Sequence, residues 1–264
     1  MAKQFHNQIA TCVLVAVAAF AFLQRAQASP SAGTEPTALA EKKGMHSRRV
    51  VAKSGNAYRL FDDSGLVADF VTMRPDRKDK RILLCIPAAF TDKIGKVDGI
   101  YVSNGVIGHK NAASDKFGGA MMIENGDFRI IATDRGAQLT PEFADEVGRS
   151  KGCMFQQFQV VRDGAQETYK DKTEFQRRAF VVFSNGKKAV AESVNAITLS
   201  QLSVDLVDLG VANALNADMG AWDEGWYRDV RGKLIVLGRD RSATRRQSNW
   251  FTLSLPPTPD SKKP

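Results

Sequence analysis

The alternation of apolar and polar residues along the chain predicts a protein built mainly from short strands. Residues 66–73 place an apolar side chain at nearly every second position, which is the pattern of a strand with one buried face. Residues 81–86 form a compact apolar run that ends at Pro87, as a fully buried strand would. The first half of the chain therefore predicts a succession of strands.

Four dipeptides with a strong tendency to form tight turns separate runs of this kind. They are Asn104-Gly105, Asn125-Gly126, Asp163-Gly164 and Asn185-Gly186. Asn-Gly and Asp-Gly supply the positive φ angles that a two-residue hairpin turn requires. In the clearest case the dipeptide joins the apolar run 120–124 to the run 128–132. The sequence therefore predicts several hairpins.

Two segments have the apolar periodicity of a helix. The first covers residues 198–210, where Thr198 can cap the start and Gly210 ends the helix. The second, shorter helix is expected over residues 141–147. With so few helices among so many strands, we expect an α+β fold, a single domain with a large curved, mostly antiparallel sheet and several hairpins.

The first residues have the pattern of a cleavable export signal. An apolar run over residues 9–23 is followed by Ala26-Gln27-Ala28, the small-residue pattern at which such signals are cut. The run is shorter than the ~20 residues of a membrane-spanning helix, and an uncleaved anchor is the alternative. We expect a signal peptide (1–28), a flexible linker (29–49), a core domain (50–255) and a disordered tail (256–264). The mature protein would be periplasmic or extracellular, with no stable membrane span.

Export changes how the charge of the chain is interpreted. Loss of Lys3 and Arg25 with the signal lowers the formal net charge from +8 by two. The basic stretches 74–81 and 239–246 would otherwise suggest nucleic acid as a partner, which export argues against. They are interpreted as solvated surface, or as contacts to anionic envelope material or phosphorylated sugars.

Export also leaves Cys85 and Cys153 as the remaining cysteines, because Cys12 is lost with the signal. In an oxidising compartment the two can form a disulfide. Both lie in apolar, strand-like runs, where a cysteine also packs as a small core residue. The sequence leaves both alternatives open.

Signatures of several common enzyme classes are absent from the sequence. It contains no G-x-S-x-G, P-loop, H-E-x-x-H, paired C-x-x-C or G-x-G-x-x-G motif. Once the signal is removed, His46 and His109 are the remaining histidines, and His46 falls in the expected linker. A histidine general base would therefore have to be His109.

The densest group of functional side chains follows the strand that residues 211–217 predict. Residues 216–228 combine an amide and an arginine with three aromatic rings and the carboxylates Asp218, Asp223 and Glu224. Rings beside carboxylates suit sugars, whose C–H faces stack on a ring while their hydroxyls bind acids and amides. The alternatives are an ordinary acidic loop with structural tryptophans, and a divalent-metal site that uses the three carboxylates as oxygen ligands.

Two smaller groups add candidates for ligand binding. Residues 98–109 include Asn104 and His109 in a glycine-rich stretch, where the backbone can approach a ligand closely or simply turn. Arg177 and Arg178 open the strand expected at 179–183, and the guanidinium fork of arginine matches phosphate oxygens. An ordinary surface position is the alternative for these arginines.

Taken in order, these segments resemble the phosphodiester glycosidase family, which includes a lysosomal enzyme that uncovers mannose 6-phosphate by removing N-acetylglucosamine. The family pattern has an Asn-Gly-Gly-Phe-like motif, a hairpin, an arginine that opens a strand, an amphipathic helix, the motif A-x-N-L-D-G-G-G-S and a late Ser-Asn. The counterparts here are residues 87–90, 119–132, Arg178-Ala179, 198–210, 214–220 and Ser248-Asn249. Their order covers most of the expected mature chain.

The resemblance implies an exported hydrolase of sugar-1-phosphodiesters or related envelope glycans, with a carbohydrate or phosphosugar as its partner and no cofactor. It implies that Asp218 acts as acid, base or nucleophile, with Asp223 or Glu224 as its partner. Arg178 would hold the phosphate. The candidates for substrate binding are Arg178, Asn216, Gly220, Asn249, Asn104 and His109.

The chain departs from the family pattern at its glycines. Met219-Gly220-Ala221 stands where the family has a glycine triplet, and Trp222 begins the stretch that replaces its serine. Side chains in place of glycines narrow or close a sugar pocket. Two alternatives follow, a hydrolase with a different substrate and a non-catalytic glycan-binding or exopolysaccharide-assembly module of the same fold.

Overall fold

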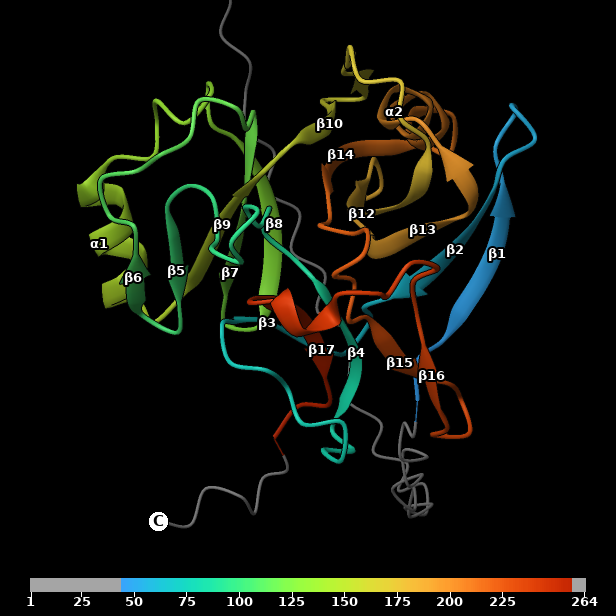
Figure 1. Ribbon diagram of the computed structural model, residues 1–264, viewed down its shortest axis with the longest axis horizontal. Helices are drawn as coiled ribbons and strands as arrows, with labels where there is room; N and C mark the ends of the chain where they lie inside the picture. Colours follow the sequence, from blue (N-terminus) through green and yellow to red (C-terminus); the bar gives the residue numbers. More distant parts are fainter. Residues whose placement is uncertain (1–43, 258–264) are drawn as a thin grey trace, which may run out of the picture. The chain divides into compact units, whose positions relative to one another are not determined.

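The computed structural model describes residues 44–257, whose strands form three antiparallel sheets (Figure 1). The largest sheet has seven strands in the order β1-β2-β13-β12-β14-β10-β11. Their bounds are β1 Ser47–Val51, β2 Ala57–Asp62, β13 Lys188–Ile197, β12 Phe175–Phe183, β14 Val211–Asn216, β10 Gln159–Arg162 and β11 Ala165–Gln166. This sheet supplies β14, the strand that ends next to Asp218.

The other two sheets have five strands each. The order β16-β15-β4-β17-β3 joins β16 Leu234–Val236, β15 Trp226–Arg228, β4 Ile82–Pro87, β17 Trp250–Ser254 and β3 Val67–Val71. The order β6-β5-β9-β7-β8 joins β6 Val106–Gly108, β5 Tyr101–Ser103, β9 Cys153–Gln157, β7 Gly119–Glu124 and β8 Asp127–Ala132. Strands that are distant in the sequence, such as β4 and β17, thus become neighbours.

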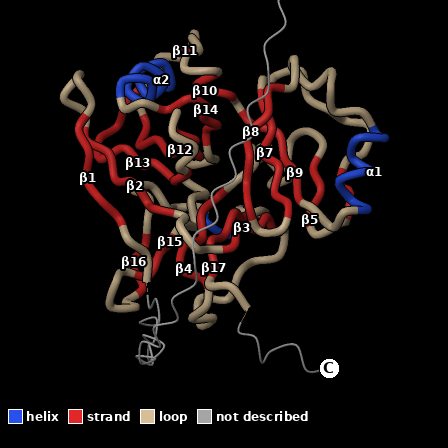
Figure 2. The backbone as a smooth tube through the Cα atoms, turned by 180° about the vertical axis from the view of Figure 1, so that it is seen from behind, coloured by secondary structure: helices blue, strands red, loops and turns tan. Residues whose placement is uncertain are grey.

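Two α-helices and one short 3-10 helix complete the described part of the chain, and Figure 2 shows how much of the backbone is strand or loop. They are α1 Pro141–Arg149, α2 Leu199–Asp208 and η1 Thr244–Arg246. Both predicted helices are confirmed, and the Thr198 hydroxyl caps α2 by accepting from the backbone N of Gln201. The predicted fold class is also confirmed, as an α+β fold of mostly antiparallel sheets with several hairpins and few helices.

The predicted hairpin turns are present, with one difference in geometry. Asn125 and Gly126 have φ angles of 53° and 77° and join β7 to β8 through a two-residue turn. The β12–β13 turn is longer, because the backbone N of Phe183 donates to the carbonyl O of Lys187. This hairpin therefore has a three-residue loop, residues 184–186, in which Gly186 has a positive φ angle of 79°.

One apolar core connects the three sheets. Phe180 of β12, Phe251 of β17 and Phe155 of β9 are all fully buried in the same cluster. The ring centroids of Phe180 and Phe251 are 4.8 Å apart, and those of Phe155 and Phe180 are 5.8 Å apart, both edge-on. Because the sheets share this core, loops from all three of them can meet around the end of β14.

The two cysteines are buried free thiols, which settles the alternative that the sequence left open. Cys85 packs with Trp226 and Trp250, whereas Cys153 belongs to the large core cluster. Burial raises the pKa of the Cys153 thiol to about 11, so it is protonated at neutral pH. Both cysteines therefore act as small core residues.

The expected signal peptide (1–28), residues 29–43 of the expected linker and residues 258–264 of the expected tail lie outside the described residues. Within residues 44–257, no helix is long and apolar enough to cross a membrane. The first strand begins at Ser47, ahead of the domain start expected at residue 50. Met45 is already buried, and its backbone N donates to the carbonyl O of Arg228.

Candidate functional site

Asp218 lies where the end of β14 meets the end of β4. Its backbone N donates to the carbonyl O of Ala88 at 3.2 Å. Its side-chain Oδ2 accepts from the backbone N of Thr91 at 3.1 Å, and Oδ1 accepts from the backbone N of Met219 at 3.0 Å. These bonds fix the direction of the carboxyl group.

Burial raises the pKa of the Asp218 carboxyl to about 7, and the nearby charge of Asp223 adds to the rise. The hydrogen bonds from Thr91 and Met219 act in the opposite direction. An aspartic acid with a pKa near neutrality can hold a proton at physiological pH and release it during a reaction. This property makes Asp218 a candidate for acid–base chemistry.

Asp218 lines a hollow of about 400 Å³ that we call the first hollow. Four aromatic side chains contribute to its wall, namely Phe90, Phe158, Tyr169 and Phe175. Its polar and charged side chains are Lys170, Asp171, Arg177, Asn216 and Asp218. Rings of this kind offer flat faces, and the polar groups provide both hydrogen-bond donors and acceptors.

Asp171 is a second carboxylate in the first hollow, and no sequence pattern pointed to it. Its Oδ1 accepts from the backbone N of Thr173 at 2.9 Å and from the Thr173 hydroxyl at 2.6 Å. These hydrogen bonds lower the pKa of Asp171. The two aspartates of the hollow therefore differ in protonation, and such a pair is typical of acid–base catalysis.

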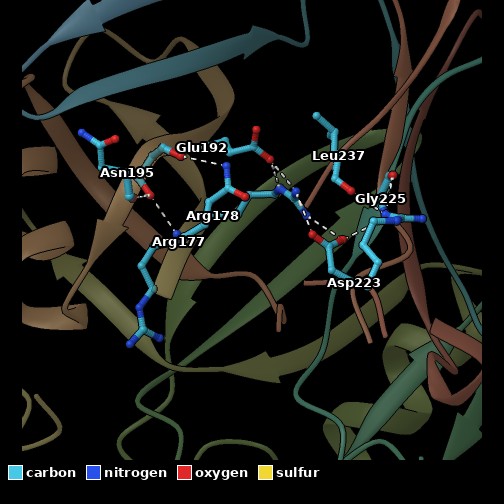
Figure 3. Close-up of polar contacts among 10 residues, drawn as sticks. Arg177, Arg178, Glu192, Asn195, Asp223, Gly225 and Leu237 are labelled. Atoms are coloured by element: carbon cyan, nitrogen blue, oxygen red, sulfur yellow. Dashed lines mark hydrogen bonds and ion pairs between the residues drawn. The ribbon is translucent and has the colours of Figure 1, made fainter. Parts of the chain in front are cut away.

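Arg177, rather than Arg178, is the arginine that lines the first hollow. Its Nε donates to the carbonyl O of Ile197 at 3.2 Å, and Nη2 donates to the carbonyl O of Thr173 at 2.8 Å. Figure 3 shows the two arginine side chains leaving β12 in different directions. The β12–β13 pairing shifts register between Gln176 and Arg178, and at this irregularity Arg177 lines the hollow while Arg178 is buried in the interior.

Arg178 is fully buried between two carboxylates (Figure 3). Its Nε donates to Glu192 Oε2 at 3.0 Å, and Nη1 and Nη2 donate to the two oxygens of Asp223 at 3.2 Å each. Burial alone would lower the pKa of Arg178, but the two carboxylates raise it, so the guanidinium stays charged. The prediction that Arg178 holds a phosphate is corrected, because it does not line the hollow.

Asp223 is fully buried as well, and its carboxylate has no room for a substrate. The backbone N of Gly225 donates to its Oδ1 at 2.8 Å. A Cβ at Gly238 would lie 2.3 Å from Asp223 Oδ2, and one at Gly225 would lie 2.8 Å from Oδ1. Asp223 is therefore an anchor for its loop and not the catalytic partner that the sequence suggested.

Glu224 forms ion pairs away from Asp218. Its carboxylate contacts Arg74 and also accepts from Arg77 Nη2 at 3.4 Å, so part of the basic stretch 74–81 binds an acidic side chain of this protein. Neither Glu224 nor Asp223 lines the first hollow. Among residues 44–257, no group of three acidic, histidine or cysteine side chains is arranged to hold a metal. The structure therefore does not bring the carboxylates of Asp218, Asp223 and Glu224 together.

Asn249 is buried behind Asp218 instead of lining the hollow. Its Oδ1 accepts from the backbone N of Ala89 at 2.7 Å, and its Nδ2 donates to the Thr91 hydroxyl at 3.1 Å. Because Thr91 donates in turn to Asp218, the amide of Asn249 holds the segment that orients the carboxyl group. Asn249 is a positioning residue.

The remaining candidates divide into two groups. Asn216 and Gly220 line the first hollow beside Asp218, and Gly220 has a φ angle of 101° that favours glycine. Asn104 and His109 are exposed in the β5–β6 hairpin, and neither lines the hollow. The structure therefore brings together Asn216, Asp218 and Gly220 from the predicted set, and adds Asp171 and Arg177.

We expect Asp223→Ala to lower the free energy of unfolding by about 3 kcal/mol, because it leaves the buried Arg178 charge with a single carboxylate. The measurement is urea denaturation at neutral pH. Asp171→Ala is the matched control and should change the free energy of unfolding by less than about 0.5 kcal/mol, since Asp171 is exposed. Equal losses in the two variants would contradict the anchoring role.

We also expect Asp218 to make the stability depend on pH between about 4 and 7. Below about 4 the folded and unfolded carboxyl groups are both protonated, since an unfolded aspartate has a pKa of about 3.9. Between these pH values the unfolded chain loses the proton that the folded chain keeps, so the free energy of unfolding falls as pH rises, and it levels off above 7.

Asp218→Asn should remove this fall. The difference in the free energy of unfolding, variant minus wild type, should grow from pH 4 to pH 7, by up to about 1.4 kcal/mol per pH unit. Chemical denaturation at several pH values measures it. Parallel stability curves for the two proteins would show that the folded Asp218 has an ordinary pKa.

Comparisons with known proteins support the fold alone. No protein-family model matches the sequence, and no curated protein matches it. The catalytic domain of zebrafish N-acetylglucosamine-1-phosphodiester alpha-N-acetylglucosaminidase, auto-inhibited by its pro-peptide, is similar in structure with a TM-score of 0.52 and 12% identity. The match covers 81% of this chain and 83% of that domain. A hypothetical protein from Synechocystis has a TM-score of 0.46 and 14% identity over 79% of this chain and 61% of its own. The chain is thus related in fold, at a distance, to the catalytic domain of a phosphodiester glycosidase.

Proposed function

We propose that this chain is a hydrolase that cleaves the glycosidic bond of sugar-1-phosphodiesters or related anionic glycans. The observation that supports it most is the Asp218 carboxyl, with a pKa of about 7, in a hollow walled by aromatic rings. The fold similarity to a phosphodiester glycosidase domain is consistent with this reaction.

The chemistry of the first hollow suits a sugar ring. The rings of Phe90, Phe158 and Tyr169 form an edge-on chain, with centroids 5.9 Å and 6.0 Å apart along it. Such rings can stack on the C–H face of a sugar, while Asn216 can hydrogen-bond its hydroxyls. In such a hollow the aromatic rings supply contact area for the sugar, and the polar groups fix its orientation.

The cationic side chains of the first hollow suit a substrate that carries negative charge. Lys170 and Arg177 line it, and Asp218 is close to half-protonated at neutral pH. Asp171 is the carboxylate that stays ionised there. The hollow therefore has a net positive charge, which attracts an anionic substrate.

In the reaction that we propose, Asp218 is the general acid and Asp171 the general base. The proton of Asp218 moves to the bridging oxygen as the bond from this oxygen to the anomeric carbon breaks. Water supplies a hydroxyl group to the anomeric carbon, and Asp171 accepts the proton of that water. Proton exchange with solvent then restores both aspartates, so one water molecule is consumed for each bond cleaved.

The alternative is a glycan-binding module without activity, and one observation favours it. Met219, which stands where the resembling family has a glycine, lines the first hollow. A side chain at this position occupies volume that a substrate would need during catalysis. Binding of a glycan without turnover is the behaviour that distinguishes this alternative.

We also propose that the protein acts outside the cytoplasm. The support is the pattern of residues 1–28, an apolar run followed by Ala26-Gln27-Ala28. Envelope glycans and their phosphorylated precursors are then the substrates within reach.

The test of activity uses the exported form with a panel of aryl glycosides and sugar-1-phosphodiesters. Asp218→Asn and Asp171→Asn should each lower kcat by about 10²-fold to 10⁴-fold, because each removes one proton transfer. Glu174→Gln is the control, since Glu174 is exposed on the same segment and does not line the hollow. It should retain wild-type kcat.

Absence of wild-type turnover across this panel would rule out the hydrolase. Glycan-array binding that persists both in the wild type and in Asp218→Asn would then support the binding module.

The test of export is the mass of the protein recovered outside the cytoplasm after expression from Met1. We expect a mature chain that begins at Ser29. Ala28→Lys should block cleavage and leave the full-length chain at the membrane. A full-length soluble chain in the cytoplasm would contradict the proposal.

A further inference from the structure

A second hollow, of about 470 Å³, lies next to the first. Its lining residues are Phe90, Thr91, Asp92, Lys93, Asp98, Lys116, Trp222 and Arg246. The proposed reaction uses none of Lys93, Trp222 and Arg246. Three of the eight side chains are cationic and two are acidic, so this hollow differs in character from the aromatic first hollow.

The two hollows meet at the candidate acid. The ring of Phe90 lines both of them. Asp218 lines the first hollow, and its Oδ2 accepts from the backbone N of Thr91, which lines the second. A bond that is cleaved at Asp218 is therefore at the junction, with one product in each hollow.

Trp222 and Arg246 contact each other in the second hollow. The Arg246 guanidinium carbon lies 5.8 Å from the centre of the Trp222 ring, a cation–π contact. A backbone bond of 2.9 Å from the N of Ala243 to the carbonyl O of Ala221 joins the segments that carry them. The pair is therefore held in place by both segments and not by its own contact alone.

The acidic groups around the second hollow already have partners within the protein. Asp98 accepts from Lys116 Nζ at 2.9 Å, and Asp92 Oδ1 accepts from the backbone N of both Ile94 and Lys96. Lys93 and Arg246 are exposed at the hollow. Three cationic side chains against two carboxylates leave the hollow with net positive charge beside the indole ring of Trp222.

We propose that the second hollow binds the phosphate-bearing leaving group of the substrate, an assignment that rests on the proposed function. Arg246 donates two parallel hydrogen bonds to the phosphate oxygens, and Lys93 adds a second positive charge. When the bond between the anomeric carbon and the bridging oxygen breaks, the electron pair goes to that oxygen, which takes up the proton of Asp218. The nearby cations hold the negative charge that the phosphate carries before and after this step. The face of Trp222 packs against the group attached to it.

The first experiment compares two substrates that share a sugar, one with a phosphodiester leaving group and one with an uncharged aryl leaving group. The quantity measured is the ratio of their kcat/KM values. We expect Arg246→Gln to lower this ratio by about tenfold or more, since a hydrogen bond to a charged group is worth about 1.5–3 kcal/mol. Arg245→Gln is the matched control because Arg245 is the exposed neighbour outside the hollow, and it should keep the wild-type ratio.

The second experiment measures binding without catalysis. Trp226 and Trp250 are buried with 1% and 2% exposure, whereas Trp222 is partly exposed in the second hollow. Titration with inorganic phosphate should therefore change the tryptophan fluorescence through Trp222. Arg246→Gln should weaken this binding about tenfold, Arg245→Gln should not, and Trp222→Phe should remove the signal.

The two experiments separate failure of this inference from failure of the proposed function. Phosphate binding that depends on Arg246, without turnover of any glycoside, would overturn the hydrolase and keep the second hollow as an anion site. An unchanged kcat/KM ratio in Arg246→Gln, or equal phosphate binding in Arg245→Gln and Arg246→Gln, would overturn the inference. Circular dichroism of each variant confirms that it is folded.

Discussion

The buried contact between Arg178 and two carboxylates is the interaction on which the rest of the candidate site depends. It joins β12, β13 and the loop after β14, with Arg178 and Asp223 fully buried and Glu192 nearly so. Three charges are costly to bury, and they are tolerated here because hydrogen bonds accompany every charge. The contact fixes Asp223, and through it the end of the loop that carries Asp218 and Trp222. Two glycines, Gly225 and Gly238, leave the space that Asp223 occupies.

Three acidic residues of one short loop have three different environments, and burial with specific partners decides which of them is available for chemistry. Asp223 faces a buried guanidinium, and Glu224 faces two arginines near the surface. Asp218 faces backbone N–H groups instead of a cation, so burial raises its pKa to about 7. The amino-acid composition does not distinguish these three carboxylates. Only Asp218 combines a shifted pKa with access to a hollow.

Local signals in the sequence predicted the hairpins, both helices and the position of Asp218 after a strand, because turns, caps and periodicity depend on nearby residues. Which of Arg177 and Arg178 lines the first hollow was not predictable, because the β12–β13 pairing shifts register between Gln176 and Arg178. Asp171 was missed for a related reason. It precedes β12 in an irregular segment, and only the tertiary fold brings it to the hollow of Asp218.

The loop between Asp218 and Asp223 is held at both ends, and in between by backbone hydrogen bonds from Asp223 N to the carbonyl O of Gly220 and from Ala243 N to the carbonyl O of Ala221. Its start is fixed by Ala88 and Thr91, and its end by Arg178. A loop whose two ends are fixed can accept other side chains between them while the strands that hold its ends keep their positions. Met219 lines the first hollow and Trp222 the second, so substitutions at these two positions reshape the walls while both backbone bonds remain. A change at either position would therefore alter which molecules fit the two hollows while the three sheets stay as they are.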